Sequence, residues 1–239
     1  MAQRFALVFF DAIDTLFRVR GSVGAVYAPV AARHGYTAEP AAIDAAFHRA
    51  MRSMPAACFP NAAPEDLPHL EREWWHESVA RVFAPPEPFP GFEPFFAEVF
   101  ELFRTASPWE LVPGAREMLV ALHRDGRRLG IVSDMDGRLF DVLTAFELGG
   151  IFDPIVLATR AGVTKRDGAL FRHALAVAGV PPAQVAHVGD NLRSDVEAAR
   201  TAGITPIHFD PSATGAPRPV PTVTRLLDVP ARLQQLEQG

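Results

Sequence analysis

The chain of 239 residues contains a single cysteine, Cys58, and a single lysine, Lys165, against 22 arginines. One cysteine excludes an internal disulfide and a cysteine-rich metal site. The net charge of −5 comes from acidic and basic residues that are interspersed along the chain, which argues against a nucleic-acid or membrane surface. A chain that otherwise uses arginine keeps one lysine, so we expect position 165 to have a specific role.

No hydrophobic run is long enough to cross a membrane or to form the core of a signal peptide. The apolar run after Arg4 ends at Phe10, where Asp11 interrupts it. We therefore expect a cytoplasmic protein. Hydrophobic residues still make up 49% of the chain, which is enough for a real core in one large domain or in a domain with an insert.

The segment from Phe5 to Phe17 is the one around which the chain is organised. Its apolar run over Phe5 to Phe10 predicts a buried strand, and Asp11 stands where that strand ends. In open α/β sheets, ligands bind beyond the carboxyl ends of the strands, where an aspartate can act as nucleophile or metal ligand. Asp11 could equally cap the following turn, so this segment alone leaves both roles open.

Residues 18–108 show the spacing of helices, whereas the segments on either side alternate strands and helices. Four amphipathic helices are predicted in this stretch, around residues 23–34, 43–54, 67–74 and 92–103. Further strands are predicted at residues 129–133, 152–158, 185–188 and 205–209, with helices between them. This alternation implies parallel pairing through right-handed crossovers. We expect residues 1–17 and 109–239 to form an α/β core and residues 18–108 a helical insert.

Signals at the ends of the strands follow one another along the sequence: Asp11, Ser133, Lys165, and Asp190 followed by Asp195. Each is weak alone. Together they resemble motifs one to four of the haloacid dehalogenase-like (HAD) hydrolase superfamily, whose phosphatases carry Asp-x-Asp-Gly-Thr after the first strand. The resemblance implies a three-layer, Rossmann-like parallel sheet of strand order 3-2-1-4-5, with the insert as an all-helical C1 cap over Asp11.

Motif one departs from the phosphatase pattern at two positions. Ile13 replaces the second aspartate, which is the general acid and base of the family, and Asp14 replaces the glycine. Thr15 matches, and it fixes the register so that Asp14 stands in the glycine position. We therefore do not expect Asp14 to replace the missing acid.

The resemblance implies a Mg²⁺ site formed by Asp11, the backbone carbonyl of Ile13 and Asp190. The carbonyl role survives replacement of the side chain at position 13. Two carboxylates also offer the hard oxygen ligands that suit Mg²⁺, an ion that keeps several waters and shares the substrate phosphate. Such a cation is needed because a negatively charged phosphoryl group must otherwise approach a negatively charged nucleophile.

The remaining motif residues are expected to act on the substrate or to support the residues that do. Ser133, with Asp134 beside it, would bind the phosphoryl group. Lys165 would place a compact positive charge between Asp11 and the phosphate. Asp195 would orient metal-bound water or Lys165.

Three functions remain in competition. The first is a Mg²⁺-dependent hydrolase of small phosphorylated metabolites that forms an aspartyl-phosphate on Asp11, with low activity because position 13 is isoleucine. The second is a 2-haloacid dehalogenase, which also lacks the second aspartate but needs no metal and does not carry the pair Asp190 and Asp195. The third is a protein of the same fold that only binds a ligand or partner, which Ile13 favours and the other retained motif residues disfavour.

A related phosphonate-cleaving branch requires a lysine in its cap, and residues 18–108 contain none. We expect a small phosphorylated substrate, and no nucleic-acid or membrane partner.

Overall fold

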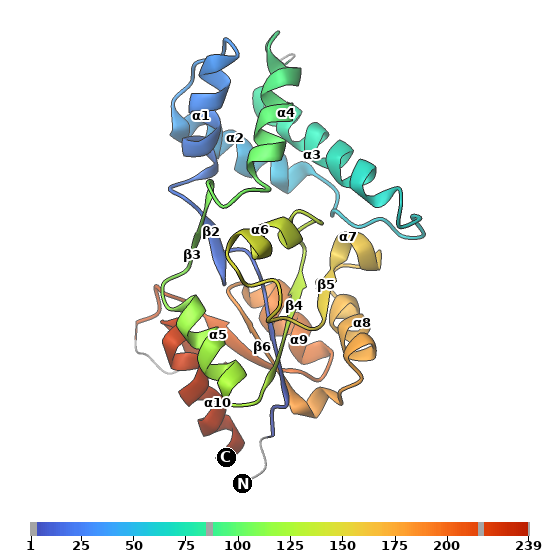
Figure 1. Cartoon of the computed structure of the whole chain (residues 1–239), viewed down its shortest axis with the longest axis vertical. Helices are drawn as coiled ribbons and strands as arrows, with labels where there is room; N and C mark the ends of the chain where they lie inside the picture. The colour runs from blue at the N-terminus through green and yellow to red at the C-terminus, as the bar shows by residue number, and fades with distance from the viewer. Residues whose placement is uncertain (1–3, 85–87, 215–217, 239) are drawn as a thin grey trace.

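A computed structural model of the chain describes residues 4–84, 88–214 and 218–238. Its centre is a six-stranded parallel sheet in the order β5-β4-β1-β6-β7-β8 (Figure 1). The strands are β1 (Leu7–Phe10), β4 (Arg128–Ser133), β5 (Ile155–Leu157), β6 (Val185–Gly189), β7 (Thr205–Phe209) and β8 (Thr222–Val223). The five predicted strands lie in the predicted order 3-2-1-4-5, so the Rossmann-like fold is confirmed. The short edge strand β8 is an addition that the sequence pattern does not predict.

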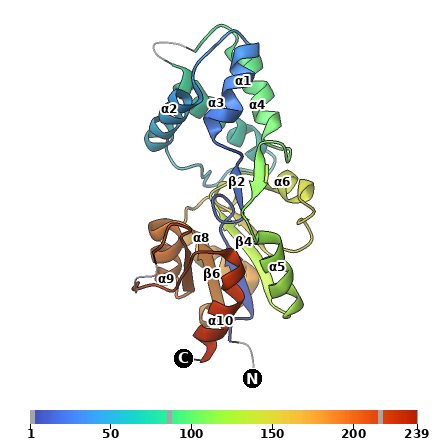
Figure 2. The same cartoon turned by 90° about the vertical axis from the view of Figure 1, so that its left-hand side faces the viewer.

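Strand β1 lies in the middle of the sheet, and all four of its side chains are buried. Val8 and Phe10 belong to the hydrophobic cluster that includes side chains of α5 and α10, whereas Leu7 and Phe9 belong to the cluster that includes α8 and α9. Helices therefore cover both faces of the sheet (Figure 2). A strand covered on both faces reads as a continuous apolar run, which is why β1 was recognisable from sequence.

The helices of the core are α5 (Ala115–Arg124), α6 (Leu139–Ala145), α7 (Ala158–Ala161), α8 (Ala169–Ala178), α9 (Ala198–Thr201) and α10 (Val229–Gln238). Short 3₁₀ turns cover Pro182–Gln184 and Leu226–Asp228. Two predicted elements differ in detail. The helix expected between the strands at residues 185–188 and 205–209 begins as a π-helix, Leu192–Glu197, before α9. Strand β5 is shorter than expected because Pro154 has no N–H to donate and Ala158 already begins α7.

Four helices lie together beyond the carboxyl ends of the strands, and we call this group the cap (Figure 1). They are α1 (Val23–Arg33), α2 (Pro40–Ser53), α3 (Leu67–Phe83) and α4 (Phe92–Leu102). All four predicted helices are present, and α3 continues past Trp74 to Phe83. Aromatic rings from different cap helices pack together, as Tyr27 does edge-on against Phe95 with ring centroids 5.7 Å apart. Aromatic side chains therefore form part of the core of the cap.

The two connections between cap and core form a two-stranded antiparallel ribbon, β2 (Phe17–Val19) with β3 (Trp109–Leu111). The expectation of helix from residue 18 is wrong here, because β2 extends two residues beyond the predicted boundary. The division into a core (1–17 and 109–239) and a cap (18–108) stays a prediction, and residues 1–3, 85–87, 215–217 and 239 of these ranges lie outside the described residues. Within the described residues, no helix has both the length and the apolar character needed to span a membrane.

Candidate active site

A cavity of about 650 Å³ lies between the carboxyl ends of the strands and the cap. The predicted site residues all line it, which are Asp11, Ile13, Ser133, Asp134, Lys165, Asp190 and Asp195. These residues are far apart in the sequence, and the parallel sheet brings them together because β1 lies between β4 and β6. We call this part of the lining the floor of the cavity.

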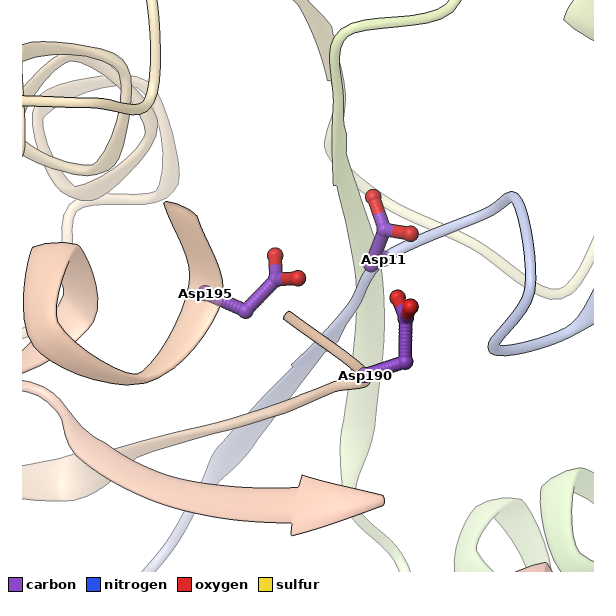
Figure 3. A group of neighbouring side chains, drawn as sticks. All are labelled: Asp11, Asp190 and Asp195. Atoms are coloured by element: carbon purple, nitrogen blue, oxygen red, sulfur yellow. The ribbon is translucent and has the colours of Figure 1, made fainter. Parts of the chain in front are cut away.

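Three carboxylates meet on the floor (Figure 3). Asp11 follows β1, Asp190 follows β6, and Asp195 belongs to the π-helix; each offers an oxygen within 4.8 Å of the other two. Gly189 allows this approach, because a Cβ atom at that position would lie only 2.4 Å from Cγ of Asp195. The Gly-Asp pair after β6 is therefore a packing requirement of the site as well as a turn.

Lys165 is the cation of this cluster. Its ammonium group donates to Oδ1 of Asp11 and, at 2.8 Å, to Oδ1 of Asp195, and the residue is only 2% exposed. Burial works against the charged amine, but the carboxylates of Asp11 and Asp195 outweigh it and raise the pKa of Lys165 above its usual range. The only lysine of the chain is thus a buried, charged member of the site.

Asp195 has both oxygens engaged by the protein. Oδ1 accepts from Lys165 and lies 3.1 Å from Nε2 of His187, and Oδ2 accepts from the backbone N–H of Asn191 at 3.1 Å. Burial alone would raise the pKa of Asp195, but Lys165 and the hydrogen bond with His187 lower it. His187 was not among the predicted site residues; an ionisable residue inside the buried strand β6 marks it as unusual but does not indicate which residue it contacts.

Asp11 and Asp190 keep more of their oxygens free of protein donors. The hydroxyl of Thr15 donates to Oδ1 of Asp190 at 3.3 Å, and Asp11 accepts from Lys165. Burial, followed by the charges of Asp195 and Asp14, raises the pKa of Asp190 to about 6. Burial also raises the pKa of Asp11, against the effect of Lys165. Three carboxylates share one ammonium group, which leaves excess negative charge on the floor.

The two unusual positions of motif one have different structural consequences. Asp14 has a backbone φ of +61°, in the left-handed region that glycine adopts without strain, and its N–H donates to the carbonyl of Phe17 at 2.6 Å. The turn therefore keeps the shape that a glycine would allow. Ile13 is half-buried and lines the cavity with an apolar side chain that can neither donate nor accept a proton.

Ser133 and Asp134 lie at the end of β4. Ser133 is buried, and its Oγ accepts from the N–H of Met135 at 3.1 Å, so its hydroxyl hydrogen can donate into the cavity. Asp134 is exposed at the cavity lining.

The cap is tied to the core beside this floor by buried polar contacts. Oε1 of Glu71, on α3, accepts from the hydroxyl of Thr159 at 2.6 Å and from the N–H of Gly137 at 3.1 Å. The indole N–H of Trp75, also on α3, donates to Oδ2 of Asp136. These contacts fix the position of α3 over the loop that follows β4.

The donor set of the floor fits a hard divalent cation. Carboxylate oxygens are the ligands that Mg²⁺ prefers, and the excess negative charge of the floor would attract such an ion. Because Asp195 has its oxygens occupied by protein donors, Asp11 and Asp190 are the two carboxylates of the triad whose oxygens would be available to such an ion.

A family model for haloacid dehalogenase-like hydrolases matches residues 5–203. The chain belongs to this family. The haloacid dehalogenase-like hydrolase domain-containing protein 3 of Xenopus laevis is 36% identical over 201 residues, which cover 83% of this chain and 81% of that protein.

Two solved structures show that this fold serves more than one reaction. L-2-haloacid dehalogenase from Xanthobacter autotrophicus matches with a TM-score of 0.71 at 21% identity, covering 96% of this hydrolase and 98% of that chain. A HAD phosphatase from Thermococcus onnurineus matches with a TM-score of 0.66 at 16% identity, covering 96% and 97% of the two chains. The choice between these reactions must therefore come from the residues of the site.

Proposed function

We propose that this HAD-like hydrolase is a Mg²⁺-dependent phosphatase of small phosphorylated metabolites. The observation that carries the proposal is the pairing of Asp190 with Asp11, whose carboxylates converge with Asp195 within 4.8 Å. A displacement at a haloacid carbon has no use for a cation next to the nucleophile. Transfer of a charged phosphoryl group does, because the approaching phosphate and the nucleophile are both negative.

The residues of the floor then take the following roles. Asp11 attacks phosphorus, so that a bond from its carboxylate oxygen to phosphorus forms while the bond to the leaving group breaks. The hydroxyl of Ser133 and the ammonium group of Lys165 donate to phosphoryl oxygens, and Asp195 holds Lys165 in place. Mg²⁺ held by Asp11, the carbonyl of Ile13 and Asp190 would neutralise charge on the phosphoryl group. Water then hydrolyses the aspartyl-phosphate.

Ile13 limits this chemistry in both steps. General acid and base catalysis contributes about 10²- to 10⁴-fold to a rate, which is roughly 3 to 5 kcal/mol of barrier. Without it, a leaving group must depart as an anion, and no side chain at position 13 activates the water of the second step. We therefore expect low turnover, best with activated phosphates such as acyl or electron-poor aryl phosphates.

The test is phosphate release from acetyl phosphate, 4-nitrophenyl phosphate and glucose 6-phosphate, and halide release from 2-chloropropionate, each with and without Mg²⁺. We expect Mg²⁺-dependent release from the first two only. Asp190→Asn should raise the Mg²⁺ concentration needed for half-maximal activity at least about tenfold, the loss that follows removal of a group important to metal affinity. The matched control is Asp153→Asn, whose side chain is 87% exposed.

Two outcomes would contradict the proposal. Release of halide without metal would favour the dehalogenase. Absence of any turnover, together with saturable binding of phosphate esters, would favour the second candidate, a binding protein, for which the apolar side chain of Ile13 at the acid position is the supporting observation.

A further inference from the structure

Above the charged floor, the cavity is lined by aromatic side chains of the cap and of β3. We call them the aromatic wall: Tyr27, Phe47, Trp75, Phe103 and Trp109. The rings support one another, since Tyr27 stands edge-on to Phe47 and to Phe103, and Phe103 is perpendicular to Trp109 with centroids 5.3 Å apart. Rings held in this way form a preformed apolar surface that can accept a flat ring at little entropic cost.

Other polar side chains that the cap presents to the cavity are engaged within the cap. The hydroxyl of Ser22 caps α1 by accepting from the N–H of Ala25, Asp44 accepts from the N–H of Gly24, and Nδ1 of His48 lies 2.7 Å from the carbonyl of Asp44. These groups have structural partners. Each of these contacts fixes the orientation of its side chain within the cap.

Two donors differ from these: Tyr27 in the wall, and Arg138 beside Trp75. Tyr27 is only 4% exposed, yet its hydroxyl makes no hydrogen bond within residues 4–84, 88–214 and 218–238. Burial raises its pKa, so the hydroxyl keeps its proton and remains a donor. Arg138 binds Asp136 through Nε and Nη2, and it lies over the rings of Trp75 and Phe100, at 4.9 Å and 4.3 Å from their centroids. Its Nη1 has no hydrogen-bond partner among the same residues.

We propose that the substrate of this hydrolase is an aryl phosphate whose ring lies against the aromatic wall. The ring carries a hydrogen-bond acceptor to which Tyr27 and Arg138 donate. This inference rests on the proposed phosphatase function and names its substrate class. The chemistry of the floor agrees with it independently. Asp11 forms the bond to phosphorus, the bond between phosphorus and the aryl oxygen breaks, and the phenolate departs with the electron pair and later takes a proton from solvent. Such a leaving group does not need the acid that Ile13 replaces.

Binding of phosphonates separates ring recognition from turnover, because their carbon–phosphorus bond is not cleaved by this chemistry. Calorimetry with Mg²⁺ would compare methylphosphonate, benzylphosphonate and 4-acetylbenzylphosphonate. We expect benzylphosphonate to bind at least about 10-fold more tightly than methylphosphonate, because burial of a ring against an apolar wall is favourable. The acetyl compound should bind more tightly again.

The chain supplies a matched pair of variants, because Tyr27 and Tyr36 are its only tyrosines. Tyr27→Phe removes the hydroxyl of a residue that lines the cavity, and Tyr36→Phe removes the hydroxyl of a ring that packs against Phe83 and Phe89 and does not line it. We expect Tyr27→Phe to abolish the preference for the acetyl compound over benzylphosphonate, a loss of about 3- to 10-fold in affinity for one neutral hydrogen bond. Tyr36→Phe should leave that preference unchanged.

The outcomes are distinguishable. Equal affinity for methylphosphonate and benzylphosphonate would overturn the assignment of an aryl substrate. A preference for the acetyl compound that Tyr27→Phe leaves intact would overturn the role of Tyr27. Either result could stand beside Mg²⁺-dependent release of phosphate from acetyl phosphate, in which case the proposed function survives and only the substrate class is wrong. Tight, Tyr27-dependent binding without turnover of any phosphate would instead contradict the phosphatase.

Discussion

On the floor of the cavity, the carboxylates of Asp11, Asp190 and Asp195 cluster around one ammonium group, whereas the wall above it consists of five aromatic rings, one of which, Trp75, lies under the guanidinium group of Arg138. The charge of Arg138 is matched by Asp136, with Nη2 and Oδ2 2.6 Å apart. The charge of Lys165 is outnumbered. The positive charge beside the wall is therefore neutralised within the protein, whereas the floor carries excess negative charge that a bound cation would neutralise.

Because of this difference, we expect the floor to carry out phosphoryl transfer and the wall to select the substrate. Excess negative charge on the floor favours Mg²⁺ and, through it, a phosphoryl group of any phosphate ester. The wall carries no net charge to attract an anion, so it acts on the leaving group by shape and by two donors. Variants of the floor should change rates with every substrate, and variants of the wall should change the ranking of substrates.

The largest effect should come from Asp11→Asn. It removes the nucleophile, and turnover of every phosphate should fall by on the order of 10⁶-fold, the scale of loss when a covalent nucleophile is deleted. The same change removes one of three mutually repelling carboxylates, so thermal unfolding without Mg²⁺ should occur at a higher temperature than in wild type. A variant that lost activity and also melted at a lower temperature would mean that the ion pair of Asp11 with Lys165 outweighs the repulsion.

The second largest effect should come from Ile13→Asp, which places an acid on the floor at the position where the phosphatases of the family carry one. Turnover of alkyl phosphates should rise by about 10²-fold or more, and that of 4-nitrophenyl phosphate by much less, because its leaving group already departs as an anion. Steady-state rates with both substrates measure the ratio. An equal rise for both, or ordinary enzyme rates of wild type on sugar phosphates, would show that the missing acid does not limit this hydrolase.

Most of the floor could be predicted from the sequence because Asp11, Ser133 and Asp190 each stand at the carboxyl end of a strand. An apolar run gives the strand, the order of parallel strands gives its neighbours, and Asp11, Ser133 and Asp190 must then meet at one edge. Lys165 lies in a loop, and it was indicated only because it is the single lysine of the chain and because it matches the family resemblance. His187 was missed because a histidine within an apolar run gives no sign of the residue that it contacts.

The wall could not be predicted at the same level. The helical spacing of the cap gave the four helices, but Tyr27 stands in a stripe that periodicity assigns to the core, and Trp75 lies one residue beyond the helix predicted at residues 67–74. Which ring lines the cavity depends on how α1 and α3 are packed. The ribbon of β2 and β3 was also missed, since strands of three residues are too short for an alternating pattern to identify.

The connection of the cap to the core, and so of wall to floor, is tested by Glu71→Ala. This change leaves the buried hydroxyl of Thr159 and the N–H of Gly137 without their acceptor, which should cost about 1 to 3 kcal/mol of unfolding free energy. Glu73→Ala on the same helix is the control, because its contact with His69 is at the surface and should contribute little. Urea unfolding of both variants gives the comparison. Equal stability of the two would mean that Glu71 does not hold the cap to the core.

Competition between a proton and Mg²⁺ for the carboxylate of Asp190 should give a smaller, measurable effect on the melting temperature. The pKa of Asp190 in the folded chain is about 6, against about 3.9 for an unperturbed aspartate. The folded state without metal therefore binds this proton more tightly, and its contribution to stability is present below about pH 4 and lost as the pH rises through about 6. Mg²⁺ binds the ionised form, so the rise in melting temperature at a fixed Mg²⁺ concentration should be larger at pH 7 than at pH 5. A rise that is the same at both pH values would exclude Asp190 as a ligand.

The smallest change in stability is expected from Asp14→Gly. Glycine adopts the φ of +61° found at Asp14 without strain, but it also gives the unfolded chain more freedom, so the two effects should leave the unfolding free energy within about 1 kcal/mol of wild type. Asn61→Gly is a matched control, because Asn61 has a φ of +63° and does not line the cavity. Only Asp14→Gly removes a charge beside Asp190, so it alone should lower the pH at which Mg²⁺ begins to stabilise the protein. If Asp14→Gly instead abolished turnover while Asn61→Gly did not, the carboxylate of Asp14 would have a catalytic role, and the explanation of low activity from Ile13 would be wrong.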